Sequence, residues 1–170
     1  SYLNSTFFSL FDASIQTEIK QVKIPYRQNS GSGGDNQSGS NGLSAKFFLL
    51  SGYEVGWTNN NSSSFPVDGA KLGYFASGTS TAANNKRIGY FNGSAAPWWL
   101  RSPNISDTYL VMTVYTGGNY DNSYCTYTNG VRPALILPSD TKLSEDGTIY
   151  NPRGVYIKQN GQWNLTYQSK

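Results

Sequence analysis

Apolar residues recur with two different periods along the chain, and the change of period predicts where helices give way to strands. In residues 4–20 the apolar side chains fall every fourth position, at Phe7, Phe11, Ile15 and Ile19. This spacing is typical of one face of a helix. Asp12 is a residue type that can cap a second helix inside this segment, which would divide it into two short helices. We therefore expect helical material at the start of the chain.

After residue 20 the apolar positions alternate or form short runs, which predicts β-strands. The expected strands are residues 22–26, 46–50, 88–91, 110–115, 120–127 and 131–137. Asn92-Gly93 and the stretch 116–119 are typical hairpin turns. Helices followed by short strands and Gly- and Asn-rich turns predict an α+β fold with an antiparallel sheet.

The length and the loops suggest one main domain with a small C-terminal addition. The 170 residues suffice for one hydrophobic core. We expect the domain to cover residues 1–138. Residues 139–170 should form a hairpin around Asn160-Gly161, packed on the domain or appended to it. Residues 28–42 contain only Gly, Ser, Asn, Gln and Asp, which predicts a solvated, mobile loop.

The residues that are missing restrict the chemistry of the chain. It has no His and a single Cys, Cys125, which excludes Ser–His and Cys–His nucleophile pairs and an ordinary zinc site. Glu54 and Asp68 are the candidate pair of catalytic carboxylates. The alternative is a buried hydrogen-bonded Glu and a turn Asp, and we favour it. Asp and Asn side chains in the loops are possible calcium ligands, but no EF-hand spacing occurs. We expect no enzyme, no metal and no cofactor.

Charge and hydropathy argue against two classes of partner. The formal net charge is +3, and the basic residues are scattered, with Lys86-Arg87 the only adjacent pair. Nucleic-acid binders concentrate basic residues in a patch, so we expect no nucleic-acid binding. No apolar run approaches the ~20 residues that span a bilayer, so we expect no membrane insertion.

The segment Asn104–Asn129 has an unusual composition, rich in Tyr, Asn, Ser and Thr and free of Lys, Arg, Glu, Gln and Trp. Such a mixture is typical of antibody-like recognition surfaces, because Tyr supplies contact area at low entropic cost. The alternative is a solvent-facing hairpin of good strand formers. The expected ligand-binding residues are Tyr109, Thr113, Tyr115, Asn119, Tyr120, Asn122, Tyr124 and Tyr127.

The pleat of the predicted hairpin assigns faces to these residues. Leu110, Met112 and Val114 should face the core, which turns the alternate residues of that strand outward. Tyr124 and Tyr127 differ in parity, so a bulge or irregular loop is needed for both to be exposed. We expect the tyrosines to cluster on one exposed face.

Two bulky blocks, PWWLRSP at 97–103 and GVRPAL at 130–135, flank this segment. Each contains one Arg, whose five donors suit loop carbonyls or a carboxylate such as Glu54. We expect Arg101 and Arg132 to be buried and multiply hydrogen-bonded. The expected structural residues are Trp98, Trp99, Arg101, Arg132 and Glu54.

The frame WWLRSP…GVRPALILP, preceded by FLLSGYEVGW and KRIGYFNG, resembles a C-type-lectin-like domain of gut bacterial and prophage proteins. The resemblance covers residues 3–139 and implies N-terminal helices, short antiparallel strands and long loops. Related domains include the variable proteins of diversity-generating retroelements and the formylglycine-generating enzymes. The reactive cysteines of those enzymes are absent, as are the Glu-Pro-Asn and Trp-Asn-Asp motifs of calcium-dependent lectins. The resemblance therefore does not imply catalysis or a metal-dependent sugar site in this chain.

In retroelement targets, adenine randomisation of codons such as AAY excludes Lys, Glu, Gln, Trp and Met. Residues 104–129 fit that alphabet except at Met112. The resemblance thus implies a non-catalytic ligand-binding domain with a variable surface, displayed on a virion or bacterial cell surface. Its partner would be a protein or glycan on a cell surface. The alternative is a structural module of a phage tail or surface protein, with the Tyr-rich face buried in a homo-oligomer.

Overall fold

Short antiparallel strands dominate the backbone of the computed structural model, which describes residues 2–11, 13–28, 36–57, 65, 67–104, 107–139, 141–143, 154–159 and 162–168. The α-helices within these ranges are α1 (Ala13–Glu18) and α2 (Thr81–Asn85). Three 3₁₀ turns accompany them, η1 (Tyr2–Asn4), η2 (Phe8–Leu10) and η3 (Gly39–Asn41). The fold is therefore β-rich, and the expected α+β class with N-terminal helices is wrong.

Tertiary contacts explain why the N-terminal segment is not the expected helix. The rings of Phe7 and Phe11 lie 5.2 and 5.1 Å from the ring of Phe47, in a compact aromatic cluster. The Asn4 side chain accepts hydrogen bonds from the backbone N–H groups of Lys46 and Phe47 and donates one to the Phe47 carbonyl. These contacts hold the backbone in separate short turns, in place of one continuous helix. The expected second cap, Asp12, lies outside the described residues.

The strands form small antiparallel sheets in the described parts of the chain, where the sequence predicted one sheet. The two-stranded sheets are β1 (Val22–Ile24) with β4 (Leu43–Ala45), β2 (Tyr26–Arg27) with β3 (Asn36–Gln37), β5 (Phe47–Leu49) with β11 (Pro133–Leu135), and β6 (Gly89–Phe91) with β7 (Ser94–Ala96). The three-stranded sheets are β8 (Trp98–Pro103), β9 (Leu110–Val114) and β10 (Tyr120–Tyr124), with β9 central, and β12 (Thr141–Leu143), β13 (Gly154–Gln159) and β14 (Gln162–Gln168), with β13 central.

The expected mobile loop at residues 28–42 is largely structured where it is described. Residues 36–37 pair with β2, and η3 follows them, so residues 36–42 belong to a hairpin and a turn. Residues 29–35 of this loop lie outside the described residues, as does the expected turn Asn160-Gly161.

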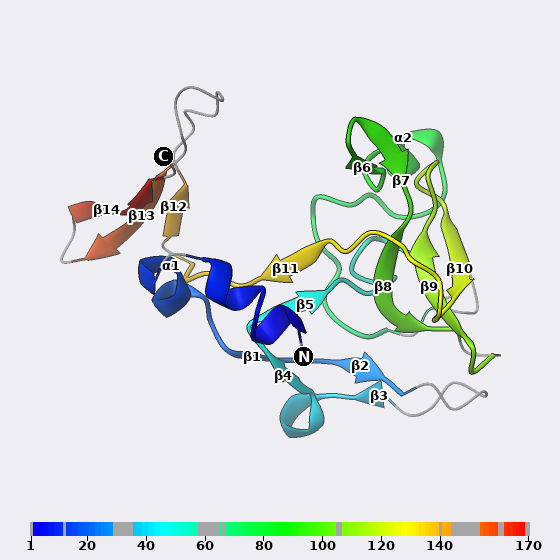
Figure 1. Ribbon diagram of the computed structural model, residues 1–170, viewed down its shortest axis with the longest axis horizontal. Coiled ribbons are helices and arrows are strands. Elements are labelled where there is room, and N and C mark those ends of the chain that lie inside the picture. Colours follow the sequence, from blue (N-terminus) through cyan, green and yellow to red (C-terminus); the bar gives the residue numbers. More distant parts are fainter. Residues whose placement is uncertain are drawn as a thin grey trace.

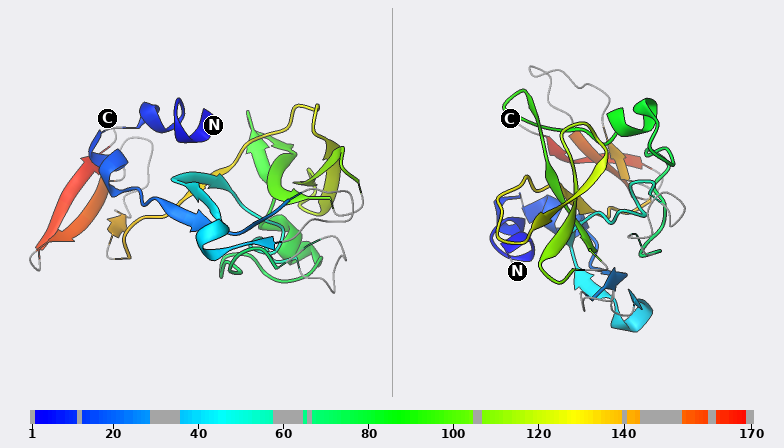
Figure 2. Two further views of the ribbon diagram at one scale, coloured as in Figure 1. Left: turned by 90° about the horizontal axis from the view of Figure 1, so that it is seen from below. Right: turned by 90° about the vertical axis from the view of Figure 1, so that its right-hand side faces the viewer.

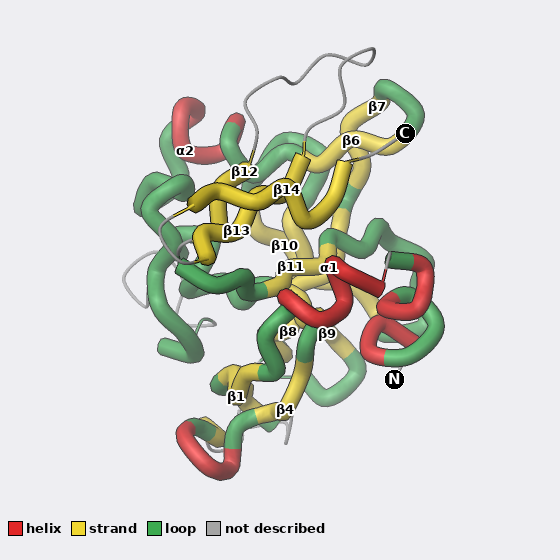
Figure 3. Tube along the Cα trace, turned by 90° about the vertical axis from the view of Figure 1, so that its left-hand side faces the viewer, coloured by secondary structure: helices red, strands yellow, loops and turns green. Residues whose placement is uncertain are grey.

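The sheets are arranged along the long axis of the molecule (Figures 1 and 2). The β12–β14 sheet lies at one end and β6–β10 at the other, with β5 and β11 between them. Within the described strands, β12, β13 and β14 pair only with one another. Helix α1 lies beside β14 (Figure 3).

Two hydrophobic clusters form the described core. The larger one consists of Val55, Trp57, Phe65, Phe75, Trp98, Leu100, Met112 and Val114. The smaller one consists of Ile24, Ala45 and Phe48. The half-buried Leu50 packs against both clusters and so connects them. The β8–β10 sheet covers the larger cluster through its alternate residues.

The β9–β10 turn contains a position that tolerates only glycine. Gly118 has φ +80°, and a Cβ there would collide with the Asn84 carbonyl in α2. We expect Gly118→Ala to lower the free energy of unfolding by about 1–3 kcal/mol, because it combines backbone strain with this clash. Gly117→Ala is the matched control, since its Cβ would meet only the Asn119 side chain, and its effect should stay within about 0.5 kcal/mol. Urea denaturation of both variants checks this, and equal effects would contradict it.

Candidate functional site

A bulge in β8 directs Arg101 toward the turn that follows β5. Trp99 pairs with Thr113 and Pro103 with Val111, so the three residues 100–102 stand opposite the single residue between Val111 and Thr113. The Arg101 backbone N–H accordingly leaves the β9 ladder and donates to the Leu50 carbonyl at 3.0 Å. Bulges commonly re-aim a side chain in this way.

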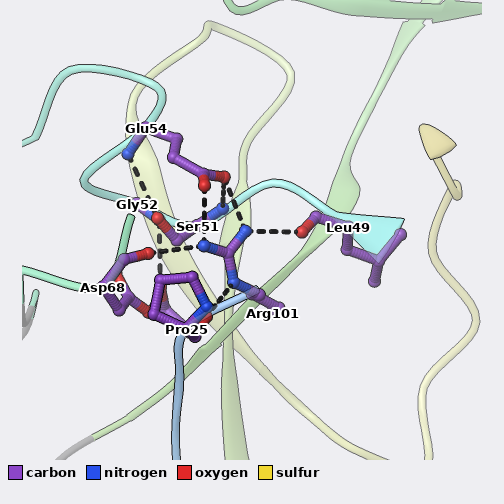
Figure 4. A network of polar contacts seen from close by, with 8 residues as sticks. Pro25, Leu49, Ser51, Gly52, Glu54, Asp68 and Arg101 are labelled. Atoms are coloured by element: carbon purple, nitrogen blue, oxygen red, sulfur yellow. Dashed lines mark hydrogen bonds and ion pairs between the residues drawn. The ribbon is translucent and has the colours of Figure 1, made fainter. Parts of the chain in front are cut away.

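The Arg101 guanidinium satisfies acceptors from four other segments (Figure 4). Its Nη1 and Nη2 donate to Glu54 Oε2 and Oε1 at 2.5 and 2.7 Å, a bidentate ion pair whose side chains are 8% and 9% exposed. Nε donates to the Pro25 carbonyl and Nη1 also to the Leu49 carbonyl, both at 2.9 Å. Nη2 further donates to the carbonyl of Asp68. The structure thus brings together Arg101 and Glu54, two residues singled out in the sequence.

Glu54 and Asp68, the candidate catalytic carboxylates, do meet near Arg101, within a buried hydrogen-bond network. Glu54 Oε2 accepts from the Ser51 backbone N–H at 3.0 Å. Asp68 Oδ2 accepts from the Ser102 hydroxyl at 3.2 Å, and that hydroxyl accepts from the Gly52 N–H at 2.9 Å. These oxygens are engaged in holding loops together, which is a structural arrangement.

Asp68 has the most perturbed carboxyl group of this network. It is 0% exposed, and its Oδ1 has no hydrogen-bond partner in the described structure. Burial raises its pKa from 3.8 to about 6. The Arg101 charge and hydrogen bonds from Ser51 and Ser102 oppose that rise, while the Glu54 charge adds to it. The carboxyl therefore holds its proton more tightly in the folded chain than in the unfolded chain.

Arg132 differs from the expectation of a buried, multiply bonded residue. It is solvent-exposed, its guanidinium lies 4.5 Å over the ring of Trp98, and its Nη1 donates to the Arg87 carbonyl at 3.2 Å. Burial against this surface lowers its pKa, and Tyr74 opposes that effect. The guanidinium stays outside the core because the buried Trp98 ring lies beneath it.

Arg87 has a fully buried guanidinium that the sequence did not indicate. It is 0% exposed and donates to the Val55 and Ala76 carbonyls at 2.6 Å and to Asn84 Oδ1 at 3.0 Å. It also lies 4.6 Å over the ring of Trp57, and burial lowers its pKa to about 10. The sequence shows only an adjacent Lys86-Arg87 pair, in which nothing marks one residue as buried.

The two tryptophans of β8 lie on opposite faces of the strand. Trp98 is 1% exposed and donates through Nε1 to the Arg87 carbonyl at 3.0 Å. Trp99 is half-buried and stands opposite Thr113. Thr113 is only 1% exposed, so its expected place on the ligand-binding surface is wrong. The reason is that β9 is the central strand and the bulky Trp99 shares its face with Thr113.

Three of the expected binding tyrosines gather where the β9–β10 ladder ends. Tyr109, Tyr124 and Tyr127, here called the tyrosine group, are 68%, 51% and 60% exposed. The Cys125 N–H donates to the Tyr109 carbonyl at 3.0 Å, which keeps the two chain segments adjacent. A turn closed by the Tyr127 N–H and the Tyr124 carbonyl replaces the strand here, and the two rings lie 5.4 Å apart. This turn supplies the irregularity that the parity argument required.

The other expected binding residues lie apart from the tyrosine group. Tyr120 is 36% exposed, as expected, but it pairs with Val114, and its ring lies 5.7 Å from those of Trp57 and Phe65 at the other end of the ladder. Tyr115 and Asn119 are exposed at the opposite end of the ladder, and Asn122 is exposed in the middle of β10. The expectation of a single tyrosine face is therefore wrong, because Tyr115 and Tyr120 lie at one end of the β9–β10 ladder and the tyrosine group lies at the other.

Comparison with known proteins gives one match. Residues 1–139 match the model of a family described as a domain of unknown function, DUF6273. No curated protein and no solved structure matches the chain. Within the described ranges, no helix is long and apolar enough to cross a membrane, and no group of three or more Cys, Asp or Glu side chains is placed to hold a metal ion.

The ion pair predicts a large difference between two arginine substitutions. Arg101→Ala should lower the free energy of unfolding by about 3–5 kcal/mol, because it leaves the buried Glu54 carboxylate without its counterion. Arg132→Ala should cost only about 1 kcal/mol, chiefly the contact with Trp98. Chemical denaturation of both variants measures this. Similar losses would show that Arg101 does not hold the loops as described.

The raised pKa of Asp68 predicts a pH-dependent contribution to stability. The folded state binds the extra proton between pH 3.8 and about 6, so this contribution is present at low pH and is lost as the pH rises through about 6. We expect Asp68→Asn to remove this dependence, so the variant should gain stability relative to the parent as the pH rises from about 4 to about 6. Thermal unfolding across that range checks it, and parallel curves for the two proteins would contradict it.

Proposed function

The chain belongs to the DUF6273 family, and within that family of unknown function we propose that it acts as a non-catalytic ligand-binding domain. The observation that carries this proposal is the exposure of the tyrosine group, Tyr109, Tyr124 and Tyr127. Three large aromatic side chains at one end of a sheet are costly to leave in water without a partner. Tyrosine suits recognition, because its ring provides apolar contact and its hydroxyl provides a hydrogen bond.

The scaffold beneath the tyrosine group supports the proposal. Strand β9 is central in its sheet and contains the buried Met112, Thr113 and Val114. Its neighbour β8 is anchored through the Arg101–Glu54 ion pair. A rigid platform reduces the ordering cost of binding, so side chains that project from it bind more tightly than those of a mobile loop.

The pattern of burial also bears on a variable surface of the retroelement type, which we propose for the exposed positions. Met112, the one residue of Asn104–Asn129 outside the randomised alphabet, is 2% exposed in the core. The exposed members of the segment, among them Asn119 and Asn122, all fit the alphabet. Variation limited to such positions would leave the core unchanged. The proposed partner is a protein or glycan on a cell surface. This chain would bind it while displayed on a virion or bacterium.

A structural module remains the second candidate, and one observation favours it. Strand β10 is an edge strand of its sheet, and Tyr124 projects from its end. An edge strand with exposed aromatic residues can pair with a second copy of the chain. Light scattering separates the candidates, because it measures molar mass. A stable homo-oligomer that dissociates on substitution of the tyrosine group would support the structural module.

The tyrosine group predicts a separation of binding from stability. The triple variant Tyr109→Ser, Tyr124→Ser and Tyr127→Ser should lose binding to a glycan array and to intact bacterial cells. Its free energy of unfolding should change by no more than about 0.5 kcal/mol per site, because the rings are exposed. Tyr2→Ser with Tyr74→Ser is the control, since those residues are 65% and 64% exposed but lie elsewhere. Retained binding by the triple variant would contradict the proposal.

A further inference from the structure

An open cleft lies between the β6–β7 hairpin and residues 128–132. It consists of two adjoining cavities of about 430 and 330 Å³. The two cavities adjoin, because they share four lining residues, Phe91, Ala96, Pro97 and Gly130. Ligand sites commonly have volumes in this range.

The hairpin wall of the cleft is held firmly while its aromatic residues stay exposed. Asn92 and Gly93, with φ +48° and +78°, turn β6 back onto β7. Gly89 lets the Trp98 ring lie directly against its backbone, because a Cβ there would come within 2.7 Å of the indole. Tyr90 and Phe91 are nevertheless 70% and 72% exposed at the rim. The rim thus offers apolar surface on a fixed support.

The polar side chains on the opposite wall offer spare hydrogen-bond donors. Arg132 has five N–H donors, and the structure pairs its Nη1 with the Arg87 carbonyl. The Asn129 Nδ2 is buried and has no partner in the described structure. Among the described residues that line the two cavities, none is an Asp or a Glu. A ligand that satisfies this wall must therefore supply oxygen acceptors, and a negative charge is favoured.

The two cavities differ in character, and the difference defines the shape of the ligand. Arg132 lines the larger cavity, and its planar guanidinium matches the two oxygens of a carboxylate. The smaller cavity is lined mainly by Phe91, Ala96 and Pro97, with Asn129 and Thr128 at its other side. A carboxylate attached to an apolar group fits both halves at once.

We propose that this cleft binds the C-terminus of a polypeptide whose last side chain is apolar. The terminal carboxylate pairs with Arg132, and the last side chain contacts Phe91, Ala96 and Pro97. Charge complementarity carries the choice, because the described lining has one cation, Arg132, and no anion. Capture of a chain end by such a site is a known recognition mode. The proposal uses none of the tyrosine group and stands apart from the proposed function.

The test uses the peptide acetyl-Gly-Gly-Phe with a free carboxylate, and the same peptide with a C-terminal amide. Each is titrated into the full chain while the indole N–H resonance of Trp98 is followed by NMR. We expect saturable binding of the carboxylate form and at least tenfold weaker binding of the amide, which corresponds to about 1.4 kcal/mol. Equal affinity for the two peptides, or no binding of either, would overturn the proposal.

Variants locate the site and separate it from the tyrosine group. Arg132→Gln should weaken binding of the carboxylate peptide at least tenfold, whereas Lys86→Gln, which removes a charge outside the lining, should leave it within twofold. Phe91→Ser should also weaken binding, and its exposure keeps the fold intact. The Tyr109, Tyr124 and Tyr127 triple variant should bind the peptide normally. Loss of binding in Lys86→Gln or in that triple variant would contradict the assigned site.

Two further ligands test the choice of occupant. Acetyl-phenylalanine carries the same carboxylate and ring without the preceding chain, and glucuronate carries a carboxylate without an apolar group. We expect the tripeptide to bind at least as tightly as acetyl-phenylalanine and glucuronate not to displace it. Tighter binding of acetyl-phenylalanine would show that the cleft takes a small free acid in preference to a chain end. Displacement of the tripeptide by glucuronate would overturn the role of the apolar half of the cleft.

Discussion

The fold depends on the buried ion pair between Arg101 and Glu54. A charged pair loses much hydration when it is buried, and the loss is offset only when the remaining donors and acceptors are satisfied. Here the guanidinium also reaches the carbonyls of Pro25, Leu49 and Asp68. One side chain therefore connects β8 to the segment before β2, the end of β5 and two loops. Few hydrogen-bonded strand pairs join these small sheets to one another, and the Arg101 side chain holds them together.

Arg87 repeats the same solution in a neighbouring part of the molecule. Its guanidinium reaches the carbonyls of Val55 and Ala76 and stacks on Trp57. Loop backbone that is buried away from regular sheets must find donors for its carbonyl groups. The two arginines supply those donors while aromatic rings supply the apolar contacts. The larger hydrophobic cluster thus combines residues of β8 and β9 with residues of these loops.

The sequence predicted those features that depend on local pattern. Alternation placed Met112 and Val114 in the core, and Asn92-Gly93 marked a hairpin turn. The donor geometry of arginine predicted bonds to loop carbonyls or to a carboxylate such as Glu54, and Arg101 makes both. Features that depend on tertiary contacts could not be predicted. The helical period of the N-terminal segment is overridden by contacts with Phe47, Thr113 is buried because its strand is central, and nothing local distinguishes Arg87 from Lys86.

The bond from Arg101 to Pro25 joins residues 76 positions apart, and β5 pairs with β11 near the end of the family-matched region. Folding that depends on contacts so distant along the chain is slow, because the loop between them loses its entropy before the contacts form. During synthesis at the ribosome, the strand formed by Phe47, Phe48 and Leu49 waits for its partner until Leu135 has emerged. In that interval an apolar strand edge is exposed, and such an edge favours association with neighbouring chains.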